Sequence, residues 1–166
     1  MTGGRCCSPE PANAQAGRQK PEPVQNRVVD LARAWVGTPY LHQASHLGVG
    51  TDCLGLLRGI WRGLYGAEPE SVPAYGRDWS EPSGDERLWQ AASRHLISAP
   101  VTSDAPGQVL LFRMRNGCVA KHLGVQVQSG TNASFVHAYS GHAVVQSPLS
   151  LPWRRRIVAR FTFPEV

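Results

Sequence analysis

The sequence predicts an α+β domain in which helices come first and an antiparallel sheet follows. Up to about residue 98, apolar residues recur at the three-to-four-residue spacing of helices, and from Val109 onward the apolar period is two. Helices that precede strands, rather than alternating with them, favour an antiparallel sheet. With 166 residues, of which 42% are hydrophobic, the chain is long and apolar enough for one domain with its own core.

Three helices are expected, over residues 24–35, 53–64 and from about 84 to 98. The first stops at Gly37, and Thr51 or Asp52 can cap the second. Ser83 and Glu86 offer a capping box to the third. In the second helix Gly55, Gly59 and Gly63 lie four residues apart, although each costs about 1 kcal/mol of helix propensity relative to Ala. We therefore expect another segment to pack closely against that face.

Five strands are expected, over residues 109–113, 122–128, 134–139, 143–147 and 157–163. Segments 40–51 and 66–82 are expected to be loops. Residues 1–23, rich in Gly, Pro and Gln, are interpreted as a disordered tail or as an over-long start of the reading frame. Residues 24–166 then make up the single domain.

Composition and charge limit the possible partners. The N-terminus lacks the apolar stretch of a signal peptide, and no apolar run reaches the roughly 20 residues of a membrane span. We therefore expect synthesis in the cytoplasm without membrane insertion. The net charge is +5, with Arg154, Arg155 and Arg156 in one cluster. This cluster is interpreted as solvated charge or as a contact for anionic cell-wall polymer; nucleic acid is not an expected partner because no nucleic-acid-binding motif is present.

Neither a metal nor another cofactor is expected. The four cysteines include no C-x-x-C spacing, which argues against zinc ribbons and redox motifs. His42 and His46 are four residues apart, but they lie in an expected loop and no acidic residue stands at a recognisable ligand spacing.

Cys53 and two later histidines form the pattern of a cysteine hydrolase. Cys53 opens a helix, His122 opens a strand, and His137 lies on the next strand. A helix N-terminus and a neighbouring imidazole both lower the pKa of a thiol, so we expect the pKa of Cys53 to fall below the free value of about 8.5. If the hairpin is symmetric about Ser129 and Gly130, His122 lies directly opposite His137, which can then orient it.

The chemistry that follows is acyl transfer. Cys53 as thiolate attacks an amide carbonyl, and protonated His122 donates to the leaving amine before it activates water. The backbone N–H of Cys53 and the hydroxyl of Tyr40 are candidate oxyanion donors. Asp52, next to the nucleophile, is grouped with Tyr40 as a candidate oxyanion or substrate-binding residue.

At these residues the chain resembles the NlpC family of bacterial cell-wall cysteine peptidases. The resemblance covers residues 27–163, and its matching stretches are Val-Gly-Thr-Pro-Tyr at 36–40, Gly-Thr-Asp-Cys-Leu-Gly-Leu at 50–56, His-Leu-Gly-Val at 122–125 and Val-His-Ala at 136–138. The resemblance implies a papain-like α+β fold, with Cys53 as nucleophile, His122 as base, His137 as the third polar residue and Tyr40 near the oxyanion. The implied substrate is the peptidoglycan stem peptide, cut between D-γ-glutamate and a diamino acid.

Two positions depart from the family pattern. Leu54 stands where the family usually has Ser, and Gln108 replaces the acidic residue of a Pro-Gly-Asp turn. Leu54 and segment 61–75 resemble the branch found in phage tails and gene transfer agents. That resemblance implies a protein that is carried on a particle, with tail proteins as partners, and that opens the wall in the periplasm. An amidase or transacylase with the same three residues, or an inactive tail-tip subunit, is the alternative.

Overall fold

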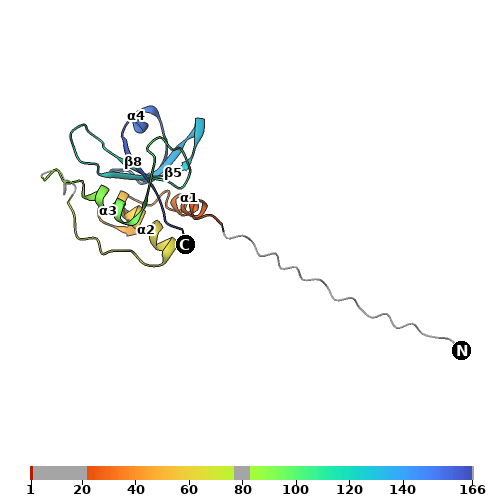
Figure 1. Cartoon of the computed structure of the whole chain (residues 1–166). Coiled ribbons are helices and arrows are strands. Elements are labelled where there is room, and N and C mark those ends of the chain that lie inside the picture. The colour runs from red at the N-terminus through yellow and green to blue at the C-terminus, as the bar shows by residue number, and fades with distance from the viewer. Residues whose placement is uncertain (2–21, 77–82, 166) are drawn as a thin grey trace.

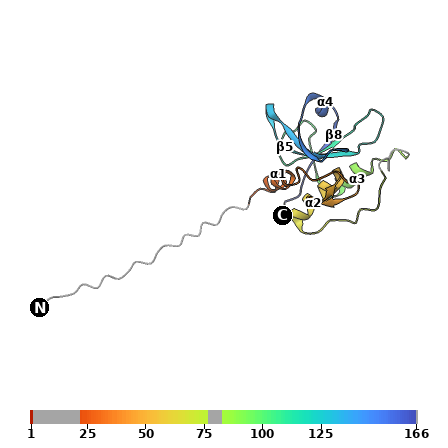
Figure 2. The same ribbon diagram turned by 180° about the vertical axis from the view of Figure 1, so that it is seen from behind.

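A six-stranded antiparallel sheet forms the centre of the molecule, with strand order β3-β8-β4-β5-β6-β7. The computed structural model describes Met1 and residues 22–76 and 83–165. Helices α1, α2 and α3 lie against one face of the sheet, and the short α4 lies on the other (Figures 1 and 2). The α+β architecture expected from the sequence is thereby confirmed. The expected tail falls largely outside the described residues, as do Cys6, Cys7 and the end of loop 66–82.

The helices are α1 Val24–Ala34, α2 Cys53–Tyr65, α3 Arg87–His95 and α4 Leu151–Arg154. The strands are β1 Ser45–His46, β2 Gly50–Thr51, β3 Ile97–Ala99, β4 Val109–Phe112, β5 His122–Gln128, β6 Ser134–Ala138, β7 Val144–Pro148 and β8 Ile157–Thr162.

Most predicted elements are found within a few residues of their expected ends. The exceptions are α4, which was not predicted, the β1–β2 hairpin inside the expected loop 40–51, and β3, which was assigned to the third helix. That helix ends at His95 because Leu96 is already extended, and Ile97 then pairs with Thr162 at the sheet edge. Within the described ranges, no helix is long and apolar enough to cross a bilayer.

The start of α2 is set by Asp52. Its side chain accepts a hydrogen bond from the Gly55 N–H at 2.8 Å, which makes Asp52 rather than Thr51 the N-cap. The capping box expected for the third helix is wrong. Glu86 occupies its N-cap without a side-chain cap, and its carboxylate instead accepts bonds from Arg113 and from the Ala120 N–H.

The glycines of α2 allow neighbouring segments to approach closely, as expected. A Cβ at Gly55 would lie 1.8 Å from the Ala44 carbonyl oxygen, and one at Gly59 would lie 2.0 Å from the Trp35 ring. The contact at Gly59 joins α2 to the end of α1, and the contact at Gly55 joins α2 to the β1–β2 hairpin. Both contacts hold the start of α2, and therefore Cys53, in a fixed place.

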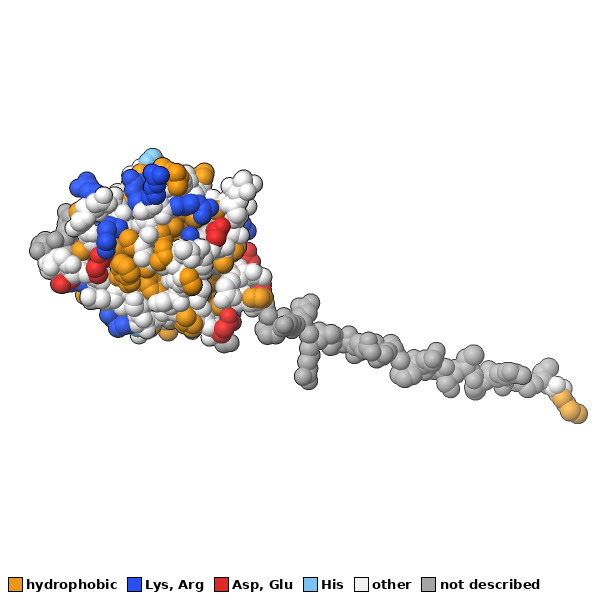
Figure 3. All heavy atoms as spheres, turned by 45° about the horizontal axis from the view of Figure 1, so that its top comes forward, with side chains coloured by type: hydrophobic (Ala, Val, Ile, Leu, Met, Phe, Trp, Pro, Cys, Tyr) orange, Lys and Arg blue, Asp and Glu red, His pale blue; other side chains and the backbone are white. Residues whose placement is uncertain are grey.

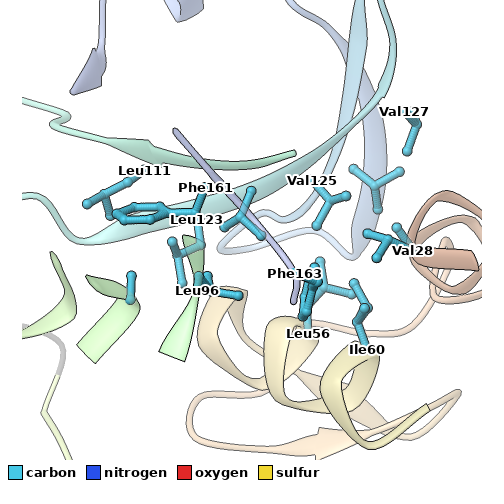
Figure 4. Packing of buried hydrophobic residues seen from close by; sticks show 14 of the residues in the cluster. Val28, Leu56, Ile60, Leu96, Leu111, Leu123, Val125, Val127, Phe161 and Phe163 are labelled. Atoms are coloured by element: carbon cyan, nitrogen blue, oxygen red, sulfur yellow. The ribbon is translucent and has the colours of Figure 1, made fainter. Parts of the chain in front are cut away.

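Both faces of the sheet bury apolar side chains. The principal core lies between the sheet and the helices, where Leu123 and Val125 of β5 meet Val28, Leu56 and Ile60 (Figure 4). The opposite face carries a smaller cluster of Leu110, Phe112, Ala133, Phe135 and Leu149, with Trp153 against it. Burial on both sides explains why β4 is apolar throughout and does not alternate.

The departure at position 108 is accommodated by a buried polar network. Arg160, which is 3% exposed, donates to Gln108 Oε1 at 2.9 Å and to Gln126 Oε1 at 2.6 Å. The Gln126 amide in turn donates to Asp104, which also accepts from the Gly130 N–H at 2.9 Å. The carboxylate that balances the buried guanidinium therefore comes from Asp104, with Gln126 between them.

Candidate active site

Cys53 is the first residue of α2, and its thiol lies beside the start of β5. The residue is partly buried, and Sγ donates a hydrogen bond to the Lys121 carbonyl oxygen at 3.8 Å. The backbone N–H groups of Leu123, Leu54 and Cys53 also act on the sulfur and favour its ionised form. The fold therefore brings the helix start and the strand start together, as the sequence pattern predicted.

The two histidines form a hydrogen-bonded chain with Ser147. His122 Nε2 lies 2.9 Å from His137 Nδ1, and His137 Nε2 lies 3.0 Å from Ser147 Oγ. Ser147 comes from β7 and was not recognised in the sequence. A serine on a predicted edge strand carries no signal of such a role until the strand order is known.

The predicted register of this hairpin is wrong. β5 and β6 pair Val125 with Val136 and Gln126 with Phe135, so continuing the ladder places Gly124, not His122, opposite His137. The loop contains the 3₁₀ turn Gly130–Asn132, and a bulge shifts the register, so the hairpin is not symmetric about its centre. His122 reaches His137 diagonally across the ladder.

Aromatic rings enclose the histidine pair. The Trp153 ring lies 5.9 Å from that of His122 and 5.2 Å from that of His137, and Phe135 stacks on His137 at 4.4 Å. Burial and the neighbouring His137 lower the pKa of His122 to about 3, and burial lowers the pKa of His137 to about 4. Both rings are therefore neutral near pH 7. Trp153 was not singled out as a site residue, because the four-residue α4 is too short to show periodicity.

Neutral rings determine how protons are arranged along the chain. When Ser147 Oγ accepts from the Nε2–H of His137, the His137 Nδ1 atom must accept from the Nε2–H of His122. His122 Nδ1 then carries a lone pair. This arrangement gives His122 the form that a general base needs.

The expected lowering of the thiol pKa is wrong for this structure. Burial and the charge of Asp52 raise the pKa of Cys53 to about 12. Among the described residues, the thiol makes no hydrogen bond to His122 or His137, because its proton is directed at the Lys121 carbonyl. The resting site is a neutral thiol beside a neutral imidazole.

Asp52 and Tyr40, the other two predicted site residues, lie close to the nucleophile. Asp52 is 3% exposed, and its carboxylate is occupied by contacts within the protein. Tyr40 is held by its backbone, which bridges to Thr51 and donates to the His142 carbonyl at 3.3 Å. A substrate contact at either residue stays a prediction.

A mainly apolar cavity of about 420 Å³ lies between α2 and α3, next to the site. Leu54, Trp61, Leu88 and Leu123 line it, and the ion pair of Arg58 with Glu68 lies at its wall. Leu54, the departure beside the nucleophile, therefore contributes its side chain to this cavity.

The expected basic cluster divides into two parts. Arg154 is partly buried and donates to the Leu149 carbonyl at 3.0 Å, whereas Arg155 and Arg156 are exposed. The Arg156 guanidinium lies 5.9 Å from the centre of the Trp153 ring. Figure 3 shows basic side chains gathered toward the upper part of the face that carries α4. In the described part of the chain, no group of three or more His, Cys, Asp or Glu side chains is placed to hold a metal ion.

The fold is that of NlpC/P60 proteins. The NlpC/p60 domain of the peptidoglycan hydrolase SagA aligns with a TM-score of 0.55 at 19% identity, over 84% of this chain and 98% of that one. A lipoprotein-like NLP/P60 family protein from Staphylococcus aureus gives 0.53 at 17% identity, over 86% and 42%. Ly7917, solved with the hydrolyzing product of MDP, gives 0.52 at 13% identity, over 84% and 63%.

The chain spans only part of some of these proteins, about two fifths of the Staphylococcus aureus protein and of an NlpC/P60 family protein from Bacillus cereus. No protein-family model and no curated protein sequence matches the chain. At identities below 20%, the likeness concerns the fold.

Proposed function

We propose that this protein is a cysteine peptidase that hydrolyses peptidoglycan stem peptides. The observation that carries the proposal is the placement of Cys53 at the start of α2, beside the strand whose first residue begins the His122–His137–Ser147 chain. This is the order nucleophile, base and orienter that acyl transfer requires.

The neutral resting pair defines the first step. The Cys53 thiol turns from the Lys121 carbonyl toward His122 and passes its proton to Nδ1 as the sulfur attacks the scissile carbonyl. The new imidazolium then donates this proton to the leaving amine, and the acyl-enzyme remains. Water, deprotonated by His122, hydrolyses the thioester and frees the thiol.

Charge on the tetrahedral intermediate needs donors. The N–H of Cys53 belongs to the unsatisfied first turn of α2, where the helix dipole favours negative charge. The Tyr40 hydroxyl is the second proposed donor. We assign to His137 the orientation of His122, because its Nδ1 lies 2.9 Å from His122 Nε2.

The proposed bond is the amide between D-γ-glutamate and a diamino acid, as the family resemblance implies. The similar fold of SagA, whose name describes a peptidoglycan hydrolase, supports the substrate class. We further propose that the protein acts in the cell wall during delivery by a phage or gene-transfer particle, with tail proteins as partners. The sequence resemblance at Leu54 and segment 61–75 supports this setting.

Mass spectrometry of muropeptides after digestion with the pure protein tests the proposal. We expect new products with a free diamino-acid amine, and none with Cys53→Ala that has retained its fold. Release of intact stem peptides from glycan would indicate an amidase instead. Transfer to an added amine would indicate a transacylase, and an inert wild-type protein would indicate a structural subunit.

A further inference from the structure

We propose that His42 is a positioning residue that is held as an imidazolium, neutralises the buried Asp52 carboxylate and thereby promotes ionisation of Cys53. The consequence for catalysis rests on the proposed peptidase function. The charge of His42 and the ionisation of Cys53, however, are properties of the folded chain and are measurable without a substrate.

The Asp52 carboxylate is buried and heavily hydrogen-bonded. Oδ1 accepts from the Gly55 N–H at 2.8 Å, and Oδ2 accepts from the Gln43 N–H and from the Tyr75 hydroxyl, both at 2.7 Å. Three donors favour the ionised carboxylate. A negative charge therefore lies in the residue directly before the nucleophile.

Both ring nitrogens of His42 face oxygen atoms that accept hydrogen bonds. Nε2 lies 2.9 Å from the Tyr75 carbonyl oxygen, and Nδ1 lies 3.4 Å from Asp52 Oδ2. A neutral imidazole has one N–H, so one of its nitrogens would direct a lone pair at an oxygen. Only the imidazolium donates to both, and the geometry therefore assigns a positive charge to His42.

Few other charged groups of the described residues bear on this cluster. Arg58 approaches Tyr75, but its guanidinium pairs with Glu68 at 2.7 Å. Tyr75 stays a neutral phenol, because burial and the Asp52 charge raise its pKa. On the far side of Cys53, His122 and His137 are neutral, since burial lowers the pKa of both. His42 is thus the cationic side chain in direct contact with Asp52.

The charge of His42 determines the net charge beside the thiol. With His42 protonated, the His42–Asp52 pair is neutral overall; without that proton, the pair carries −1. A negative charge beside a thiol disfavours the thiolate, and the Asp52 charge contributes to the raised pKa of Cys53. Loss of the His42 charge should therefore make Cys53 less reactive.

The test is the rate of Cys53 alkylation by iodoacetamide as a function of pH, followed by mass spectrometry of the Cys53 peptide. We expect His42→Gln to slow alkylation at pH 8 by about three- to tenfold, with the profile moved to higher pH by about half to one unit. His42→Lys, which keeps a cation, should recover part of the rate. His46→Gln is the matched control, because His46 is exposed on β1 and should leave the profile unchanged. Equal profiles for wild type and His42→Gln would overturn the proposal.

A second measurement covers the case in which His42→Gln fails to fold. Nitrogen-15 spectra of the wild-type imidazoles at pH 7 should show His42 protonated at both nitrogens, and a neutral tautomer there would refute the assignment. A wild-type protein that cleaves no muropeptide yet shows the His42-dependent alkylation profile would support this inference and defeat the peptidase proposal.

Discussion

His122 and His137 are joined by a 2.9 Å hydrogen bond although they do not face one another across the β5–β6 ladder. Gly124 lies opposite His137, and a Cβ there would come within 3.3 Å of the His137 Cβ and 2.7 Å of the Phe135 ring. The small residue leaves room for the His137 ring to lean toward His122. The bond engages Nε2 of His122 and leaves Nδ1 for the thiol.

The first prediction concerns the order of importance along the histidine chain. Because His122 exchanges the proton and His137 only orients it, His122→Ala should lower kcat/KM for a stem peptide by about 10²- to 10⁴-fold. His137→Ala should retain more activity, and Ser147→Ala more again. Steady-state kinetics on a soluble stem peptide measures all three. A His137→Ala variant as inactive as His122→Ala would contradict the assignment of His137 as orienter.

The second prediction concerns stability in acid. The folded-state pKa values of His122 and His137 are lowered to about 3 and about 4, so between these values and about 6.5 the unfolded chain binds protons that the folded chain does not. The free energy of unfolding should therefore fall as pH drops below about 6.5, by up to about 1.4 kcal/mol per pH unit for each histidine. Urea unfolding at pH 7, 6 and 5 measures this slope. Replacement of the exposed His46 by Gln should leave it unchanged, whereas His137→Gln should flatten it; equal slopes in both variants would contradict the burial argument.

The third prediction concerns Gly124. Gly124→Ala should destabilise the fold by about 1–3 kcal/mol, because its Cβ would press on the Phe135 ring and disturb His137. Activity should fall as well. Gly76→Ala is the matched control, since a Cβ there meets nothing within 4 Å. Thermal unfolding and peptide hydrolysis measure the two effects, and a Gly124→Ala protein with wild-type activity would show that the close approach is unnecessary.

The fourth prediction concerns the buried network around Arg160. Gln126→Leu removes both the acceptor of one Arg160 hydrogen bond and the amide that reaches Asp104. A buried charge that loses a partner should cost about 2–4 kcal/mol. The exposed Gln90 provides the control, and Gln90→Leu should change the free energy of unfolding by less than about 0.5 kcal/mol. Denaturant titrations that give similar values for both variants would argue against Gln126 as a link to Asp104.

The fifth prediction concerns wall association. Arg155 and Arg156 are exposed, whereas Arg154 is tied to the Leu149 carbonyl, so only the first two are free to contact an anionic polymer. Replacing both by Gln should weaken binding to purified walls and reduce its salt dependence, because screening shortens to about 8 Å near physiological salt. Hydrolysis of a small stem peptide should stay within about twofold of wild type. If hydrolysis falls as much as wall binding, the two arginines support the site through Trp153 instead.

The sequence alone determined the order of the elements and the chemistry at two strand and helix starts. Helical spacing before residue 98 and the period of two after Val109 depend on local alternation of apolar residues, which does not require knowledge of the fold. In the same way, Cys53 at a helix start and His122 at a strand start were visible as local patterns. The elements that the sequence missed, β3 and α4, are three and four residues long and too short to show a period.

Only the tertiary structure decided which groups meet. The diagonal contact of His122 with His137 depends on a 3₁₀ turn and a bulge, and Ser147 and Trp153 join the site from segments that follow it in the chain. The ionisation of the site was likewise beyond the sequence. A helix start predicted a lowered pKa for Cys53, but burial and the adjacent Asp52 charge raise it, because desolvation and Coulomb interactions depend on how the chain packs around the thiol.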